Sequence, residues 1–229
     1  MKVTTDACLF GAWAANCILE SRLERKESTT NPHILDIGSG TGLLALMLAQ
    51  QTTAHTDTIE IDSAAIEQAN ENIAASPWKN FICVLEGDAR RYPYTRKYDV
   101  IISNPPFYED EWKSDEQSRN IAHHSELLNI RDVLTIISHQ LTPDGIFFLL
   151  LPYKRLQEIQ EWLPHYPLQI NQWVTVKPSV QHPPFRIFLA GSSKEKGTPP
   201  VRRELSIRNE HQQYTPEFIA LLKDYYLYL

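Results

Sequence analysis

Residues 33–50 read HILDIGSGTGLLALMLAQ, and this stretch decides the fold. It begins with a short apolar run, 33–37, that is typical of a buried strand, and it ends with an apolar segment of helical character. Three of the chain's eight glycines lie between them, at Gly38, Gly40 and Gly42. Glycines concentrated in this way indicate a tight turn whose backbone a ligand can approach closely, beside the N–H groups that open the helix. The pattern is GxGxG, without the Lys-Ser/Thr of a phosphate-binding P-loop.

The same alternation of strand and helix continues outward from this stretch. The periodicity predicts helices over 6–23, 43–50, 63–75, 130–141, 155–163 and 216–225, and strands over 33–37, 58–61, 81–85, 98–103, 145–151, 172–176 and 186–190. A polar linker is expected before the last helix. Strands separated by helices predict a parallel sheet, whose ligands gather at the carboxyl ends of the strands. The loops after Ile37, Ile61, Leu85 and Ser103 are therefore the places to look for chemistry.

Composition limits the classes of protein to which the chain can belong. The chain has 229 residues, 42% hydrophobic and 22% charged, which is ordinary for a globular protein, and we found no apolar run long enough for a transmembrane helix. Three cysteines without a CxxC pair argue against a disulfide framework or a zinc site, so we expect no metal and a reducing, cytoplasmic setting. The net charge of −6 combines −9 in residues 1–149, +4 in residues 150–210 and −1 in residues 211–229. A local basic region leaves nucleic acid open as a partner.

Acidic residues follow the next two strands. Glu60, roughly 20 residues after the glycines, is placed to accept hydrogen bonds from ribose hydroxyls. Asp62 is better explained as the cap of the helix that follows. Asp88, in Gly87-Asp88-Ala89, is able to accept from an adenine amino group, with the Ala89 N–H as a donor, although a simple turn is the better explanation of those three residues taken alone.

The fourth loop carries Asn104-Pro105-Pro106-Phe107. Two prolines fix the backbone and withhold N–H donors, so the Asn104 side-chain oxygen and the Pro105 carbonyl are held as acceptors. Two acceptors that converge suit a planar amino group, and Phe107 offers a face on which a base can stack. The four residues are our candidate catalytic residues.

Taken together, these loops resemble the class I S-adenosylmethionine-dependent methyltransferases over about residues 33–151, and Asn104–Phe107 resembles the Asp/Asn/Ser-Pro-Pro-Phe/Tyr/Trp signature of amino methyltransferases. The resemblance implies an α/β, Rossmann-like fold with a mostly parallel seven-stranded sheet and helices on both faces. It also implies S-adenosyl-L-methionine as cofactor. The cofactor-binding residues that it implies, with those of the loops above, are Thr5, Asp6, Asp36, Gly38, Ser39, Gly40, Gly42, Glu60, Asp88, Ala89 and Asn104.

A narrower resemblance spans nearly the whole chain. Residues 1–6 (MKVTTD), 9–13 (LFGAW), 76–78 (SPW), 213–215 (QYT) and 224–227 (DYYL) resemble the bacterial tRNA1(Val) adenine-N6 methyltransferase family. That family usually has Lys-Val-Gly-Thr-Asp at the first motif and a Phe-rich segment before it. We therefore expect Met1 to correspond to an internal methionine of the family.

The resemblance also points to residues that contact RNA. Arg119 and His123, in the polar segment 108–126, resemble a basic stretch of the family, and with Phe107 and Arg186 they are our candidate substrate-binding residues. The segment is expected to be a disordered connection or a lid. Nine positive charges between residues 154 and 208, interleaved with aromatic rings, are expected to face RNA.

The resulting prediction is N6-methylation of an adenine in tRNA, with adenine 37 of tRNA1(Val) implied by the resemblance and no membrane partner. Two alternatives remain: a methyltransferase acting on another exocyclic or side-chain amine, in rRNA or a release factor, and a non-catalytic module that binds the cofactor or RNA. We expect a single domain over 1–229, with an N-terminal helix and loop (1–32), a cofactor-binding and catalytic core (33–151) and a basic C-terminal part (152–229).

Overall fold

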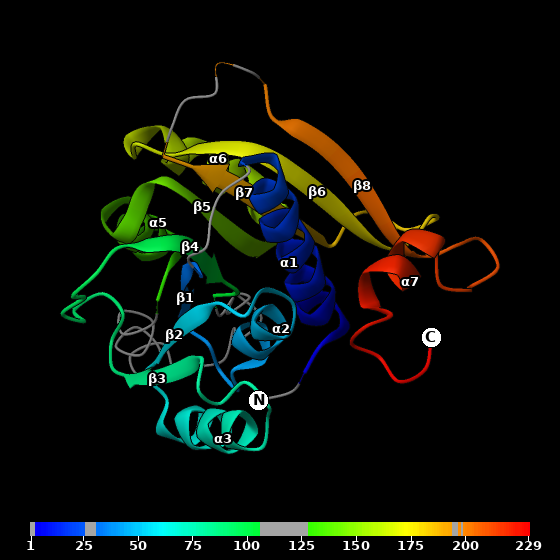
Figure 1. The fold of residues 1–229 in the computed structure, drawn as a ribbon. Coiled ribbons are helices and arrows are strands. Elements are labelled where there is room, and N and C mark those ends of the chain that lie inside the picture. Colours follow the sequence, from blue (N-terminus) through cyan, green and yellow to red (C-terminus); the bar gives the residue numbers. More distant parts are fainter. Residues whose placement is uncertain (1–2, 26–30, 106–127, 194–196, 198) are drawn as a thin grey trace, which may run out of the picture.

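The computed structural model describes residues 3–25, 31–105, 128–193, 197 and 199–229 (Figure 1). The helices in these ranges are α1 (Thr5–Arg25), α2 (Leu43–Thr52), α3 (Ser63–Ala74), α5 (Ile130–Gln140), α6 (Leu156–Trp162) and α7 (Pro216–Leu222), with short 3-10 helices η1 (Tyr153–Arg155) and η2 (Leu163–His165). The strands are β1 (His33–Ile37), β2 (His55–Glu60), β3 (Ile82–Glu86), β4 (Tyr98–Ser103), β5 (Leu141–Pro152), β6 (Gln169–Ser179), β7 (Arg186–Ser192) and β8 (Val201–Arg208).

The described strands form one sheet in the order β3-β2-β1-β4-β5-β7-β6-β8. Only β7 runs against its neighbours, antiparallel to β5 and β6, and the other adjacent pairs are parallel. The predicted mostly parallel α/β sheet is confirmed, with eight strands where seven were expected. The eighth, β8, lies in the stretch predicted to be a polar linker. Its first half is exposed, and only Leu205 and Ile207 face the core, so its local pattern did not indicate a strand.

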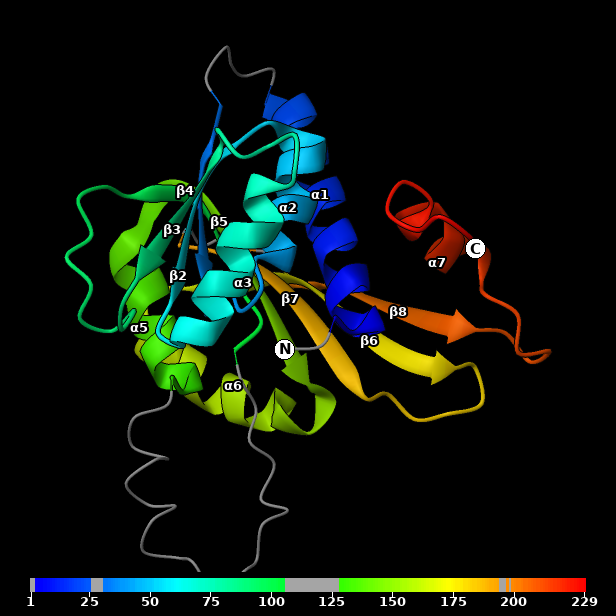
Figure 2. The same ribbon diagram turned by 90° about the horizontal axis from the view of Figure 1, so that it is seen from below.

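Helices cover both faces of the sheet, as predicted. Buried side chains of α1, α2 and α7 pack on one face, and those of α5 and α6 pack on the other. Figure 2 shows α1, α2 and α3 on one side of the strands and α5 on the opposite side. Three aromatic rings, Phe10 and Trp13 of α1 and Phe188 of β7, hold the long N-terminal helix against the middle of the sheet, with ring centroids 5.2–6.1 Å apart. None of the helices in the described ranges combines the length and apolarity needed to cross a membrane.

Local capping explains where α3 begins but not where α1 begins. Asp62 accepts hydrogen bonds from the N–H groups of Ala64 and Ala65, at 2.9 and 3.4 Å, which confirms it as the cap of α3. Asp6 was expected to cap the first helix, but α1 already begins at Thr5. The Asp6 side chain instead reaches across to the sheet, where it has a partner described below.

Candidate active site

The loops singled out in the sequence meet at one edge of the sheet. Because β3, β2, β1 and β4 are neighbours and parallel, their carboxyl ends all lie at that edge. Asp88, Glu60, Gly38 and Asn104 follow or end these four strands in that order across the sheet. Four predicted site residues that are far apart in sequence therefore share one edge.

Hydrogen bonds fix the glycine loop to the strands on either side. The Gly38 N–H donates to the carbonyl of Ile59 in β2, at 2.9 Å. On the other side, the buried hydroxyl of Ser103 donates to the carbonyl of Ile37, at 2.7 Å. Ser103 immediately precedes Asn104, so this bond ties the start of the candidate catalytic motif to the strand that carries the glycines.

The three glycines adopt backbone conformations that other residues rarely tolerate. Their φ angles are +69° at Gly38, +55° at Gly40 and +77° at Gly42. A Cβ at Gly42 would lie 3.6 Å from the Cβ of Ala69, which is an ordinary contact, so the positive φ and not a lack of space requires glycine there. The concentration of glycines is thus explained by the backbone conformation of the turn.

Glu60 is held by the backbone around it. Its buried carboxylate accepts three N–H groups, from Gly40 at 2.8 Å, Ile61 at 2.8 Å and Asp62 at 3.0 Å. The Gly87 N–H donates to the carbonyl of Glu60 at 2.8 Å, which links the loop after β3 to the same point. A carboxylate has about four acceptor positions, so one remains for a ligand while the other three organise the loops.

We predict that Glu60→Gln destabilises the protein by about 2 kcal/mol, because the amide keeps one acceptor oxygen and turns an N–H₂ group toward backbone N–H donors. Urea denaturation measures the change. Glu86→Gln is the matched control, since Glu86 pairs with Glu60 in the β2–β3 register and is exposed. Equal unfolding free energies for the two variants would contradict the role given to Glu60.

Asp36 lies fully buried in β1, one residue before the strand ends. Neither of its carboxylate oxygens has a hydrogen-bond partner in the described part of the chain. Burial, together with the nearby charge of Glu60, raises the pKa of Asp36 to about 7. A buried acid without a partner beside a glycine loop is a group prepared to meet a polar ligand.

Asp88 is held by an arginine that the sequence analysis did not single out. The guanidinium of Arg90 donates to both carboxylate oxygens, with Nε 2.9 Å from Oδ1 and Nη2 2.8 Å from Oδ2. This contact lowers the pKa of Asp88. Ala89 is buried, and its carbonyl accepts a hydrogen bond from the Tyr94 hydroxyl at 3.0 Å, which fixes the turn.

The structure describes the first two residues of the candidate catalytic motif, Asn104 and Pro105. Asn104 is half-buried and Pro105 is buried, directly after β4. Pro106, Phe107, Arg119 and His123 lie outside the described residues, so their predicted roles stay predictions.

Two residues assigned to different ligands meet each other. Arg186, predicted to bind substrate, donates from Nε to Oδ2 of Asp6, predicted to bind cofactor, at 2.6 Å. Arg186 begins the antiparallel strand β7 and pairs with Pro152 at the end of β5, so it lies at the edge of the sheet that carries the glycine loop. Thr5 is exposed beside Asp6 in the first turn of α1. The ion pair therefore joins the start of α1 to the sheet.

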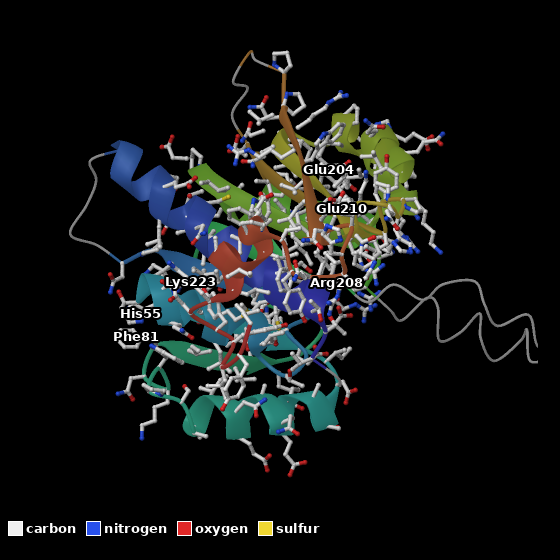
Figure 3. All side chains as sticks on the ribbon, turned by 90° about the vertical axis from the view of Figure 1, so that its right-hand side faces the viewer. His55, Phe81, Glu204, Arg208, Glu210 and Lys223 are labelled. Atoms are coloured by element: carbon white, nitrogen blue, oxygen red, sulfur yellow. The ribbon has the colours of Figure 1, made fainter. Side chains whose placement is uncertain are left out.

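Three residues of the basic stretch, Lys177, Arg202 and Arg208, have acidic or aromatic partners in the fold. Arg202 at the start of β8 lies over the ring of Trp173, and Arg208 at its end lies over the ring of Tyr214, 4.6 and 4.4 Å from the ring centroids. Lys177 is paired with Glu204 at 2.8 Å. Figure 3 shows acidic Glu204 and Glu210 on the same side of the molecule as Arg208. The stretch is a mixed surface, and its contact with RNA stays a prediction.

The residues present fit S-adenosylmethionine. Its ammonium and ribose hydroxyls are donors, and this edge of the sheet offers unused acceptors in the orphaned Asp36 carboxylate and the remaining position on Glu60. The hydroxyl of Ser39 is also buried without a partner in the described residues. The positive-φ glycines leave the backbone between these groups without side chains.

Comparison with known proteins decides the family. Residues 12–144 match the family model of the methyltransferase small domain. The chain is 38% identical over 229 residues to the tRNA1(Val) (adenine(37)-N6)-methyltransferase of Parabacteroides distasonis, covering 99% of this chain and 91% of that protein. It is also 38% identical to the enzyme of the same name from Pectobacterium carotovorum, covering 100% and 88%. The chain belongs to this family. The predicted family, enzyme class and S-adenosylmethionine cofactor are thereby confirmed.

Solved structures of methyltransferases confirm the fold of this family member. A predicted O-methyltransferase from Agrobacterium tumefaciens superimposes with a TM-score of 0.66 at 15% identity, covering 95% of both chains. The glycopeptide N-methyltransferase MtfA complexed with S-adenosylmethionine gives a TM-score of 0.53 at 10% identity, covering 77% of this chain and 87% of that one.

Ser103 and Arg90 are the site residues that sequence reasoning missed. Ser103 is the last residue of a strand and Arg90 lies in a turn, and neither position belongs to a motif. Asp88 followed two residues later by Arg90 is a weak local signal, because aspartate often accepts the N–H two residues on, as it does here at 3.0 Å. Only the fold shows that the guanidinium turns back onto the same carboxylate.

Proposed function

We propose that this protein transfers a methyl group from S-adenosylmethionine to N6 of adenine 37 in tRNA1(Val). The observation that carries the proposal is the joint presence of the family relationship and an intact Asn104-Pro105 at the end of β4, beside the glycine loop. A non-catalytic module would have no need to keep these acceptors. The enzyme's contact with the anticodon arm is part of the proposal.

Asn104 and Pro105 bind and orient the target amine. The side-chain oxygen of Asn104 and the carbonyl of Pro105 accept its two N–H groups and direct the nitrogen lone pair toward the methyl group. No strong general base is needed in this step, since the rate comes from positioning and electrostatics. Ser103, bonded to the Ile37 carbonyl, keeps this acceptor pair in register with the cofactor loop.

The neighbouring loops hold the cofactor. S-adenosylmethionine supplies the electrophilic methyl group when bound. Asp36 and the loop Gly38–Gly42 receive its methionine part, Glu60 accepts from the ribose, and Asp88 with the Ala89 N–H recognises the adenine. The start of α1, with Thr5 and Asp6, closes over the methionine part, held there by the ion pair to Arg186.

The substrate adenine reaches this edge only if it leaves the stack of the anticodon loop, so the enzyme acts on an unstacked or flipped base. Phe107 stacks on that base, and Arg119 and His123 contact the RNA around it. Arg186 lies at the same edge and contributes through the position of α1.

The experiment is methylation of tRNA from a strain that lacks the modification, followed by mass spectrometry of nuclease digests. We expect N6-methyladenine in one fragment that contains position 37 of tRNA1(Val), and none when that adenine is replaced by guanine. Methylation of ribosomal RNA or of a release factor, with tRNA left unmodified, would replace this proposal by the alternative amine-directed activity. If none of these acceptors is methylated, the proposal is excluded.

A further inference from the structure

Arg90 contacts the carboxylate of Asp88 at the carboxyl edge of the sheet. Four hydrogen bonds from one residue reach one carboxylate. The Arg90 backbone N–H and Nε donate to Oδ1 at 3.0 and 2.9 Å, and Nε and Nη2 donate to Oδ2 at 3.1 and 2.8 Å. The two side chains are 25% and 21% exposed, so the pair lies at the surface of the site and is open to a ligand.

The geometry leaves Asp88 able to accept one more donor. Oδ1 receives two donors from Arg90, while Oδ2 receives Nη2 and only the longer, shared contact from Nε. An acceptor position is therefore left on Oδ2. The bidentate guanidinium also fixes the plane of the carboxylate, which a single-point contact from a lysine would not do.

We propose that Arg90 is a positioning residue for cofactor recognition: it holds the Asp88 carboxylate in the orientation that accepts the N6–H of the cofactor's adenine. The inference rests on the proposed function, because it assumes that Asp88 faces that adenine. Without the Arg90 side chain, the backbone N–H of residue 90 still holds Oδ1, but the plane of the carboxylate is no longer fixed, and a ligand has to supply that part of the ordering when it binds. With Arg90, the ordering is already present, and the Tyr94 hydroxyl on the Ala89 carbonyl fixes the same turn.

The test compares two ligands that differ at the adenine amino group. S-adenosylhomocysteine carries the N6–H donor, whereas S-inosylhomocysteine has a carbonyl oxygen there, which faces the carboxylate unfavourably. Titration calorimetry measures both dissociation constants for the wild type and for Arg90→Gln. We expect Arg90→Gln to weaken S-adenosylhomocysteine roughly tenfold, as for loss of a charge-assisted hydrogen bond, and to leave the inosyl ligand nearly unchanged. The variant thus loses most of the preference for the amino group.

Arg91→Gln is the matched control. It removes the same charge one residue away, and the exposed Arg91 side chain acts on the Asp88 carboxylate through its charge, while the Arg91 backbone N–H that donates to the Asp88 carbonyl at 2.9 Å is kept. It should keep the wild-type preference, and Arg90→Lys should restore only part of it. If Arg90→Gln weakens the binding of both ligands equally, Arg90 has a structural role. If it weakens the binding of neither ligand, Arg90 has no role in cofactor recognition. Either result overturns the inference. If the wild type binds neither ligand, the proposed cofactor chemistry fails, whereas a wild type that binds with an insensitive Arg90→Gln refutes only the role of Arg90.

Discussion

Asn104→Ala is expected to lower the rate of methyl transfer to tRNA by about 10²- to 10³-fold, the usual cost of removing one preorganised hydrogen-bonding group at a reacting centre. The substitution removes one of the two acceptors that hold the target amine. It leaves the Pro105 carbonyl, the glycine loop and the acids of β1 and β2 in place. Cofactor affinity should fall far less than turnover, because most of the residues proposed to hold the cofactor lie on the loops after β1, β2 and β3.

Single-turnover methylation and cofactor titration on the same preparation separate the two effects. Asn104→Asp is the informative companion, since aspartate occupies this position in the amino methyltransferase signature and keeps an acceptor oxygen. We expect it to retain more activity than Asn104→Ala. A parallel loss of turnover and cofactor binding in Asn104→Ala would instead make Asn104 a structural residue of the loop.

Asp36→Asn is expected to change how stability depends on pH. The folded protein raises the pKa of Asp36 from its ordinary 3.8 to about 7, so the fold favours the protonated acid. The stability that this provides is complete below about pH 4 and is lost as the pH rises to 7, to an extent on the order of 4 kcal/mol. The asparagine variant lacks this loss. The wild type should therefore weaken relative to the variant by up to about 1.4 kcal/mol per pH unit in that range.

Urea denaturation of both proteins between pH 4.5 and 8, without cofactor, provides the measurement. The difference between the two curves isolates the contribution of Asp36. The same substitution removes the charge proposed to receive the cofactor, so S-adenosylmethionine should bind about tenfold more weakly at pH 8, where the apo variant gains most in stability. Parallel stability curves would show that Asp36 is not protonated near neutral pH in the folded protein.

Much of the cofactor edge was predictable because its signals are local. Gly38, Gly40 and Gly42 are needed for a backbone that other residues resist, and their φ angles confirm the reason. Glu60 was predicted from its position at the end of a strand, and that position in a parallel sheet brings it to the glycine loop. The parallel sheet itself followed from the alternation of strand and helix.

The missed features depend on partners far away or on side-chain direction. β8 is an edge strand with an exposed first half, and its pairing with β6 decides its structure. Asp6 looked like a helix cap, yet Arg186, 180 residues later, takes its carboxylate. In the basic stretch, only the fold shows that Lys177 is paired with Glu204 and that Arg202 and Arg208 lie over aromatic rings, and its contact with RNA stays a prediction.

The sequence by itself thus determined the α/β class, the glycine turn after β1 and the Asn-Pro-Pro motif after β4, since each needs particular residues next to one another in the chain. Tertiary structure alone decided which charges are already neutralised. Asp88 is paired with Arg90, Asp6 is paired with Arg186, and Asp36 is left without a partner in the described chain. The physical reason is that two charges interact strongly only when they lie within a few ångströms of each other, and the fold, not the order of residues, sets those distances.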